Sequence, residues 1–246
     1  MVVGLKISSQ TQGFIQIGTG YNNLRLLKSG TIDVNTFTSE GGVLSGYIVA
    51  NSGSLPVSTD IDSIYVIRYL TTDNRFGFSI MKRRLPVSGN ISNSLFIAQN
   101  APIRSAEYYI FGNGNPAVTG AVGLRVKSES GEVSYDSRMK QLRVLQAVNL
   151  PTMSAPIISL GQFFPGKKIG LALANPRFRY DAPFQERCYM YADQISMDAS
   201  NNIWMNYTEV VQRVEAGAFP LGNVTAANTN AVLLIIDLDE IPIPFN

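Results

Sequence analysis

Two residue types that carry much of enzyme chemistry are nearly missing from this chain. Histidine is absent from its 246 residues, and cysteine occurs once, at Cys188. The lack of histidine excludes His-ligated zinc, the Ser-His-Asp and Cys-His catalytic arrangements and histidine acid–base catalysis. A single cysteine excludes a disulfide within the chain, so stability has to come from core burial or subunit contacts. We therefore expect no enzymatic activity, no metal site and no cofactor.

Charge is also scarce. Charged residues make up 15% of the chain and apolar residues 45%, and 20 Lys and Arg against 18 Asp and Glu give a net charge of +2. The longest block of like charge is Lys82-Arg83-Arg84, for which a solvated strand end is the simpler interpretation. This balance does not indicate a nucleic-acid or anionic-membrane partner. A surface with so little charge suggests that partners cover much of it.

Long apolar runs are missing as well. No stretch approaches the length of a membrane span, and the first residues lack the charged start and apolar centre of a signal peptide. We expect that the chain is synthesised in a cytoplasm and does not insert into a membrane.

What the sequence does contain is an internal repeat. The segments 3–27 and 122–145 share three features in the same order: the opening Val-Gly-Leu-Lys/Arg, a turn glycine (Gly13 and Gly131) and a closing Leu-Arg-Leu/Val-Leu. The offset is 119 residues at the first match and 118 at the last. Such a repeat indicates duplication. We expect two tandem domains at 1–115 and 120–246, separated by the turn-forming stretch 112–116.

Period-two alternation predicts that both domains are all-β, with sandwich or barrel-like architecture. Each is expected to open with a hairpin, in which Val3, Leu5, Ile7 and Val122, Leu124, Val126 face a core while Lys6 and Arg125 face away. Tyr207–Ala218 could be helical, but its β-branched residues favour a strand or irregular structure. Further strands are expected at 24–27, 44–50, 64–69, 76–81, 94–98, 108–111, 142–148, 169–174, 187–192, 203–207 and 231–238.

Each candidate site in the sequence also has a simpler structural interpretation. The pairs Asp60/Asp62 and Asp237/Asp239 place two carboxylates on one face of an extended segment, as a calcium site or a glycosidase would need, but a solvated strand edge is the favoured interpretation. The tyrosines Tyr108 and Tyr109 could stack on sugar rings, yet their strand positions favour the core or a subunit interface. The apolar tail Ile241, Ile243 and Phe245 is interrupted by prolines, so it should dock on another surface. Candidate interface residues are Ile241, Ile243, Phe245, Tyr108 and Tyr109.

The second repeat also carries a family resemblance. Gly123-Leu124-Arg125-Val126, followed by Gly131 and then Tyr135-Asp136-Ser137, resembles the signature GL-V--S-G---FDS of small virion proteins encoded among the tail genes of tailed bacteriophages. The first repeat departs from it, since Ile17-Gly18-Thr19 stands where the aromatic-Asp-Ser triplet would be. The resemblance implies a tail or baseplate component and assigns no catalytic residues.

Two functions follow as expectations. The first is a structural component of the virion in the tail tip, baseplate or fibre-attachment region, which binds other virion proteins and is located in the particle. The alternative is a tail protein that binds a host receptor or surface glycan. In either case we expect a homo-oligomer, and a trimer is favoured because three duplicated chains would match sixfold tail symmetry to a threefold fibre.

Overall fold

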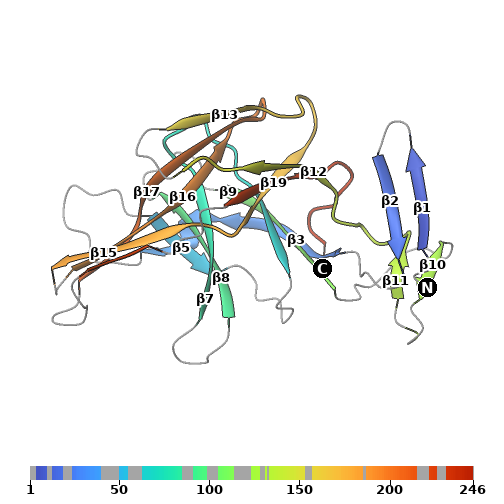
Figure 1. Ribbon diagram of the computed structural model, residues 1–246, viewed down its shortest axis with the longest axis horizontal. Coiled ribbons are helices and arrows are strands. Elements are labelled where there is room, and N and C mark those ends of the chain that lie inside the picture. Colours follow the sequence, from blue (N-terminus) through green and yellow to red (C-terminus); the bar gives the residue numbers. More distant parts are fainter. Residues whose placement is uncertain are drawn as a thin grey trace.

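The computed structural model describes residues 4–9, 13–18, 24–39, 50–54, 63–84, 91–98, 105–113, 123–127, 131, 133–152, 157–184, 187–214, 222–225 and 231–245. Over these residues the chain forms two large antiparallel sheets and two separate hairpins, with one 3-10 turn, η1 (Val34–Thr36), and no α-helix (Figure 1). The all-β prediction is confirmed. No sheet of the described residues closes into a barrel.

The first large sheet has six strands in the order β12-β19-β14-β6-β9-β3. Three of them precede residue 115 and three follow residue 120. The two sets meet in the middle of the sheet, where β14 pairs with β6 at Leu171 and Ile67. The strands are β3 (Arg25–Asp33), β6 (Ile64–Arg68), β9 (Ser105–Gly112), β12 (Val144–Asn149), β14 (Ile169–Ala174) and β19 (Val232–Asp237).

The second large sheet has nine strands, seven of them in the order β13-β17-β16-β7-β8-β5-β4, with β15 pairing to β16 and β18. Here too the two parts of the chain meet in the middle, at Ile195 of β16 and Phe78 of β7. Strands from both sides of the 115–120 boundary therefore share both sheets. The strands are β4 (Thr38–Ser39), β5 (Ala50–Ser54), β7 (Phe78–Arg84), β8 (Ile91–Ala98), β13 (Ile158–Gln162), β15 (Phe178–Phe184), β16 (Arg187–Met197), β17 (Asn202–Val214) and β18 (Gly222–Thr225).

The main core lies between the two sheets. Alternation along each strand sends every second side chain inward, so that Ile195 and Met197 of β16 join this core while Gln194 and Ser196 lie on the outer face. The six-stranded sheet contributes residues such as Ile67 and Leu171 from its two central strands. Because these inward residues come from both parts of the chain, the two parts bury each other.

A second, smaller core covers the outer face of the six-stranded sheet. Val66, Tyr109 and Ile236 point to this face and are covered by the chain after β19, beginning with Leu238 and Ile241. The tail then reaches β3, where Ser29 and Phe245 exchange backbone hydrogen bonds of 3.0 and 3.3 Å. The apolar tail thus docks on its own chain.

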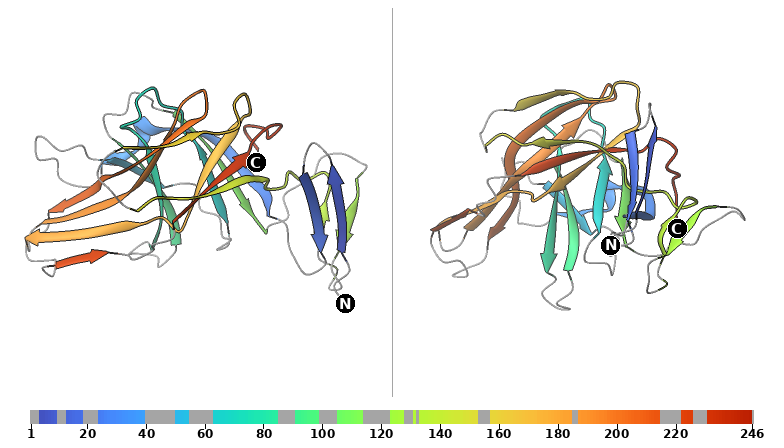
Figure 2. Two further views of the ribbon diagram at one scale, coloured as in Figure 1. Left: turned by 45° about the horizontal axis from the view of Figure 1, so that its top comes forward. Right: turned by 45° about the vertical axis from the view of Figure 1, so that its right-hand side comes forward.

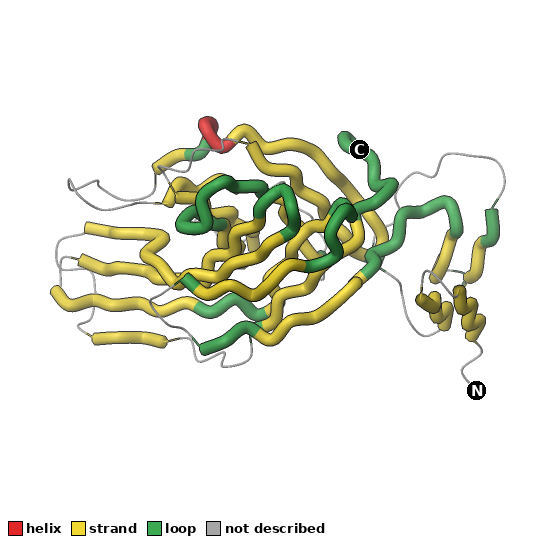
Figure 3. Tube along the Cα trace, turned by 90° about the horizontal axis from the view of Figure 1, so that it is seen from above, coloured by secondary structure: helices red, strands yellow, loops and turns green. Residues whose placement is uncertain are grey.

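The two hairpins stand apart from the sheets, at one end of the molecule (Figures 1 and 2). They are formed by β1 (Gly4–Ser9) with β2 (Gly13–Gly18), and by β10 (Arg125–Lys127) with β11 (Val133–Asp136). The view from above also shows the hairpins beyond one end of the two packed sheets (Figure 3).

The prediction that Leu124 and Val126 of the second hairpin face a core is wrong. Leu124 is 49% exposed, and Val126 is only partly buried. The reason is that a hairpin standing outside the sheets has no core to face. Val3 and Val122 lie outside the described residues, and the side chains of Leu5, Lys6 and Ile7 are not described.

Strand positions agree with the sequence where alternation is clear. The strand expected at 169–174 is β14 itself, and the ambiguous stretch after Tyr207 continues as β17 to Val214. The sequence did not predict β13, β15 or β18. Most of the strand expected at 44–50 lies outside the described residues.

Gly77 allows the two parts of the nine-stranded sheet to join. A Cβ at this position would lie 2.8 Å from the backbone carbon and oxygen of Ile195. We expect Gly77→Ala to lower the free energy of unfolding by about 1–3 kcal/mol, because β7 and β16 have to move apart. Urea unfolding of the purified protein would measure this. Thr31→Ala, at an exposed position on β3, is the control, and equal midpoints for the two variants would contradict the assignment.

Candidate functional site

The signature residues of the second hairpin converge on one buried carboxylate. Asp136 is 0% exposed and ends β11. Its oxygens accept hydrogen bonds from the Arg138 backbone N–H (3.0 Å), from Arg138 Nε (2.8 Å) and Nη2 (2.5 Å), and from Arg125 Nε (2.9 Å). Two guanidinium groups therefore hold this carboxylate between the strands of the hairpin.

The neighbouring signature positions complete the same structure. Ser137 and Leu124 exchange two hydrogen bonds of 2.9 Å, from the Leu124 N–H to the Ser137 hydroxyl and from the Ser137 N–H to the Leu124 carbonyl. A Cβ on Gly123 would lie 2.7 Å from the Arg138 side chain, which crosses it on the way to Asp136. Gly131 has φ +85°, a conformation that favours glycine. Each of these residues serves the hairpin turn or its closure.

The arginines determine the ionisation of Asp136. The side-chain hydrogen bond from Arg138 is the largest cause that holds the pKa of the Asp136 carboxyl well below its usual range, against burial, which acts in the opposite direction. The carboxylate stays ionised and fully engaged with its arginines. It is therefore suited to fix the hairpin rather than to transfer protons.

Arg25 connects this hairpin to the first part of the chain. It is 1% exposed, and its Nη2 donates to the Val133 carbonyl. Burial lowers the pKa of Arg25, and the Asp136 charge partly offsets this effect. The backbone joins the same contact, because Leu26 N–H donates to the Lys140 carbonyl and Leu142 N–H to the Leu24 carbonyl, both at 2.8 Å. The starts of the two repeated Leu-Arg segments thus lie side by side.

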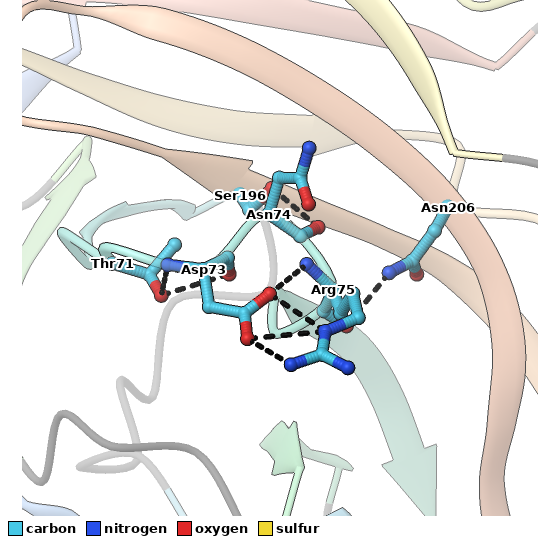
Figure 4. Close-up of polar contacts among 6 residues, drawn as sticks. All are labelled: Thr71, Asp73, Asn74, Arg75, Ser196 and Asn206. Atoms are coloured by element: carbon cyan, nitrogen blue, oxygen red, sulfur yellow. Dashed lines mark hydrogen bonds and ion pairs between the residues drawn. The ribbon is translucent and has the colours of Figure 1, made fainter.

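A second contact between the two parts of the chain is the loop before β7 (Figure 4). Its backbone carbonyls at Asn74 and Arg75 accept hydrogen bonds from Ser196 Oγ (3.2 Å) and Asn206 Nδ2 (3.0 Å), which lie on β16 and β17. Asp73 and Arg75 shape the loop through a bidentate ion pair, with its shortest contact at 2.6 Å. No sequence pattern indicated this contact of the loop with β16 and β17.

The structure also shows a buried ion pair that no sequence pattern indicated. Arg177 and Asp193 are 3% and 0% exposed in their side chains, with Nε to Oδ2 at 2.8 Å and Nη2 to Oδ1 at 3.0 Å. Their spacing in the sequence is sixteen residues, so only the pairing of β16 with the chain before β15 brings them together.

The predicted carboxylate pair Asp237/Asp239 does come together, but in a turn. Asp239 N–H donates to Asp237 Oδ1 (3.0 Å), and Lys168 N–H donates to Asp239 Oδ1 (2.9 Å). Lys167 Nζ lies 3.5 Å from a carboxylate oxygen of each aspartate. Lysine thus provides positive charge beside this pair, and no group of three metal-binding side chains occurs in the described part of the chain. Asp60 and Asp62 lie outside it.

The five candidate interface residues are buried or partly buried against their own chain. Tyr108 belongs to the main core and Tyr109 to the outer one, as the core alternative predicted. The Tyr109 hydroxyl donates a hydrogen bond to Glu107 (2.6 Å). Burial is the main cause that raises the pKa of Tyr109, and this hydrogen bond raises it further. Ile241 is buried, while Ile243 and Phe245 are partly buried in the outer core. A role of the tail between chains stays a prediction.

Three further polar features lie on strands of the nine-stranded sheet. The side chains of Lys82, Arg83 and Arg84 at the end of β7 are not described. Asn206 is buried in β17, and its side-chain amide donates to the Arg75 carbonyl. Arg179 lies over the rings of Tyr191 and Tyr207, at 4.9 and 5.9 Å from their centroids.

Comparison with known proteins gives no further constraint. A scan against protein-family models, a search of curated proteins and a search of solved structures find no match for this chain. Among the described residues, no helix has the length and apolar character needed to cross a membrane.

Removal of the Asp136 charge should loosen the hairpin. We expect Asp136→Asn to lower its local stability by about 1–3 kcal/mol, because charged hydrogen bonds to two arginines are lost. Amide hydrogen exchange at pH 7 should accelerate over residues 123–143 and remain unchanged in β14. The control is Asp33→Asn, an exposed position where an amide oxygen can keep the bond to Asn35 N–H. Unchanged exchange in the Asp136 variant would contradict the anchoring role.

The low pKa of Asp136 also gives a pH dependence with a definite sign. Because the folded-state pKa is depressed, its stabilisation is complete above the unfolded value of about 4 and is lost as the pH falls toward the folded value. The difference in hairpin stability between wild type and Asp136→Asn should therefore be constant from pH 7 to 5 and shrink below pH 4.

The tail can be tested on the isolated chain. Because Ile241 is buried in the outer core, Ile241→Ala should lower the free energy of unfolding by about 2–4 kcal/mol. Glu240→Ala is the control, since its contact with Lys140 is an exposed ion pair at 3.8 Å. An Ile241 variant as stable as wild type would show that the tail does not dock on its own chain in solution.

Proposed function

We propose that this chain is a structural component of a tailed-bacteriophage virion, in the tail tip, baseplate or fibre-attachment region, and that it acts through protein–protein contacts. The observation that carries the proposal is the use of the signature residues. Gly123, Gly131, Asp136 and Ser137 all serve to build and fix a hairpin outside the sandwich. A residue pattern that shapes a projecting arm fits a protein that joins others.

The surface of that arm supports the same conclusion. An isolated two-stranded hairpin is marginally stable in water, and this one exposes 49% of Leu124. The arm therefore has apolar surface that its own chain does not cover. A neighbouring protein in an assembly would cover it.

We also propose that the chain arose by duplication into two tandem β-domains, 1–115 and 120–246. The strand orders support this, because β3-β9-β6 and β12-β19-β14 run inward from opposite edges of one sheet. Each half starts with a hairpin, and β7 with β8 corresponds to β16 with β17 in the other sheet. In this scheme the two copies meet through equivalent strands.

The remaining parts of the proposal concern chemistry and place. The protein is not an enzyme and takes no cofactor; the carboxylates Asp136 and Asp237 are engaged by arginine and lysine. It is made in the host cytoplasm, is located in the virion tail and forms a homo-oligomer. The sequence favours a trimer.

Incorporation into particles tests the function. The chain or its Leu124→Glu variant would be supplied in trans to a phage that lacks it, and its copies in purified particles would be counted by quantitative mass spectrometry. We expect wild-type chain in particles and at least a fivefold loss for Leu124→Glu, because a charge replaces exposed apolar surface on the arm. Thr31→Glu, on the exposed face of β3, should be incorporated normally.

Two outcomes would contradict the proposal. Particles that are complete without the chain would exclude a structural role. Binding of the isolated protein to host cells, or cleavage of host polysaccharide by it, together with unchanged incorporation of Leu124→Glu, would favour the receptor-binding or enzymatic alternatives.

A further inference from the structure

Two free strand edges lie on the same side of the sandwich. The strand β12 ends the six-stranded sheet and β13 ends the nine-stranded sheet (both in the upper part of Figure 1). In the described structure, β12 pairs only with β19 and β13 only with β17. Val144 and Ile157 beside these edges are 49% and 38% exposed, and they are two of the three most exposed large apolar residues described.

These edges lack the charges that usually protect an edge strand. Residues 144–166, which include both strands and their connection, contain no Asp, Glu, Lys or Arg. Natural edge strands are commonly guarded by charge, proline, short length, bulges or covering segments, because unpaired backbone groups attract another strand. In both sheets, then, an edge that no described segment covers has a bulge but no charge, which favours a contact surface.

The opposite edge of the six-stranded sheet shows the contrast. There β3 carries Lys28 and Asp33, and its outer side is covered by its own chain. Leu26 N–H is bonded to Lys140, and Ser29 is bonded to Phe245 in both directions. The chain thus protects one edge and leaves the other open.

The centre of the molecule shows how such edges can join. There β6 pairs with β14 and β7 pairs with β16, both antiparallel, so that both sheets continue across the same junction. Each edge of β12 and β13 is short and interrupted by a register shift, after Val144 and after Ser159. A stable contact on this side therefore needs both edges together, as in the centre.

We propose that the β12–β13 face binds the same face of a second copy of the chain about a twofold axis. The partner has to present two uncharged edges in two layers about 10 Å apart. A second copy does so by symmetry, and the twofold axis makes both strand pairs antiparallel, as are all the named strand pairs described within the chain. This deepens the homo-oligomer part of the proposed function, with a twofold contact in place of the trimer expected from the sequence.

The mass of the purified full chain tests the proposal. Light scattering after size exclusion should give twice the chain mass of 26.9 kDa at about 0.1 mM protein. Ala147→Lys and Ser159→Lys, at exposed positions on the two strands, should each weaken the dimer at least tenfold, because like charges then face each other across the axis. Both variants should keep the melting temperature of the control. Thr31→Lys, which puts the same charge on β3, should remain dimeric.

A second measurement does not depend on any variant. Hydrogen exchange of the wild-type protein should slow with rising concentration at residues 144–149 and 158–162 and stay constant at β3. A monomer at 0.1 mM, a mass of three chains, or concentration-independent exchange at both edges would overturn the proposal. These results are separate from the particle test, because a monomeric chain found in particles refutes only the twofold contact, and a dimer absent from particles refutes only the virion role.

Discussion

The structure depends on the antiparallel contact between the two parts of the chain. Strands β6 and β14 in one sheet, and β7 and β16 in the other, close the main core, to which both parts contribute: Ile67, Phe78, Leu171 and Ile195. Buried apolar surface is the dominant favourable contribution to folding, and here much of it exists only when both parts are present. The close approach at Gly77 and the hydrogen bonds from Ser196 and Asn206 to the preceding loop follow from this contact.

Several charged residues of the chain lie inside it. Arg177 with Asp193, and Arg125 and Arg138 with Asp136, form ion pairs with fully buried carboxylates, and Arg25 is itself buried. Such groups are costly to bury unless they are paired, so each pair fixes one geometry. Elsewhere the chain has long stretches without charge, such as residues 144–166.

Local sequence patterns predicted part of the fold. The features that depend on contacts between residues far apart in the sequence could not be predicted from such patterns. Alternation located β14 and identified β17 as a strand, because period two reflects one buried face. The same rule failed at Leu124, since alternation indicates two different faces but not whether a core lies beside either. The buried pair Arg177–Asp193 and the cluster of Arg25 with Asp136 join residues far apart in sequence, for which no spacing rule exists. The strand β13, with a bulge after Ser159 and a glycine, has an interrupted period that conceals it.

The signature residues around Asp136 bond to one another within the hairpin. An aspartate beside a serine and a tyrosine suggests chemistry, yet Ser137 is bonded to the Leu124 backbone, Tyr135 is buried and Asp136 is held by two arginines. The first hairpin, where Ile17-Gly18-Thr19 replaces the triplet, has the same two-stranded form without this carboxylate. Because one hairpin forms without the triplet, the triplet adds rigidity rather than the hairpin itself. A rigid arm loses less conformational entropy when it binds a partner, as the proposed role in assembly would require.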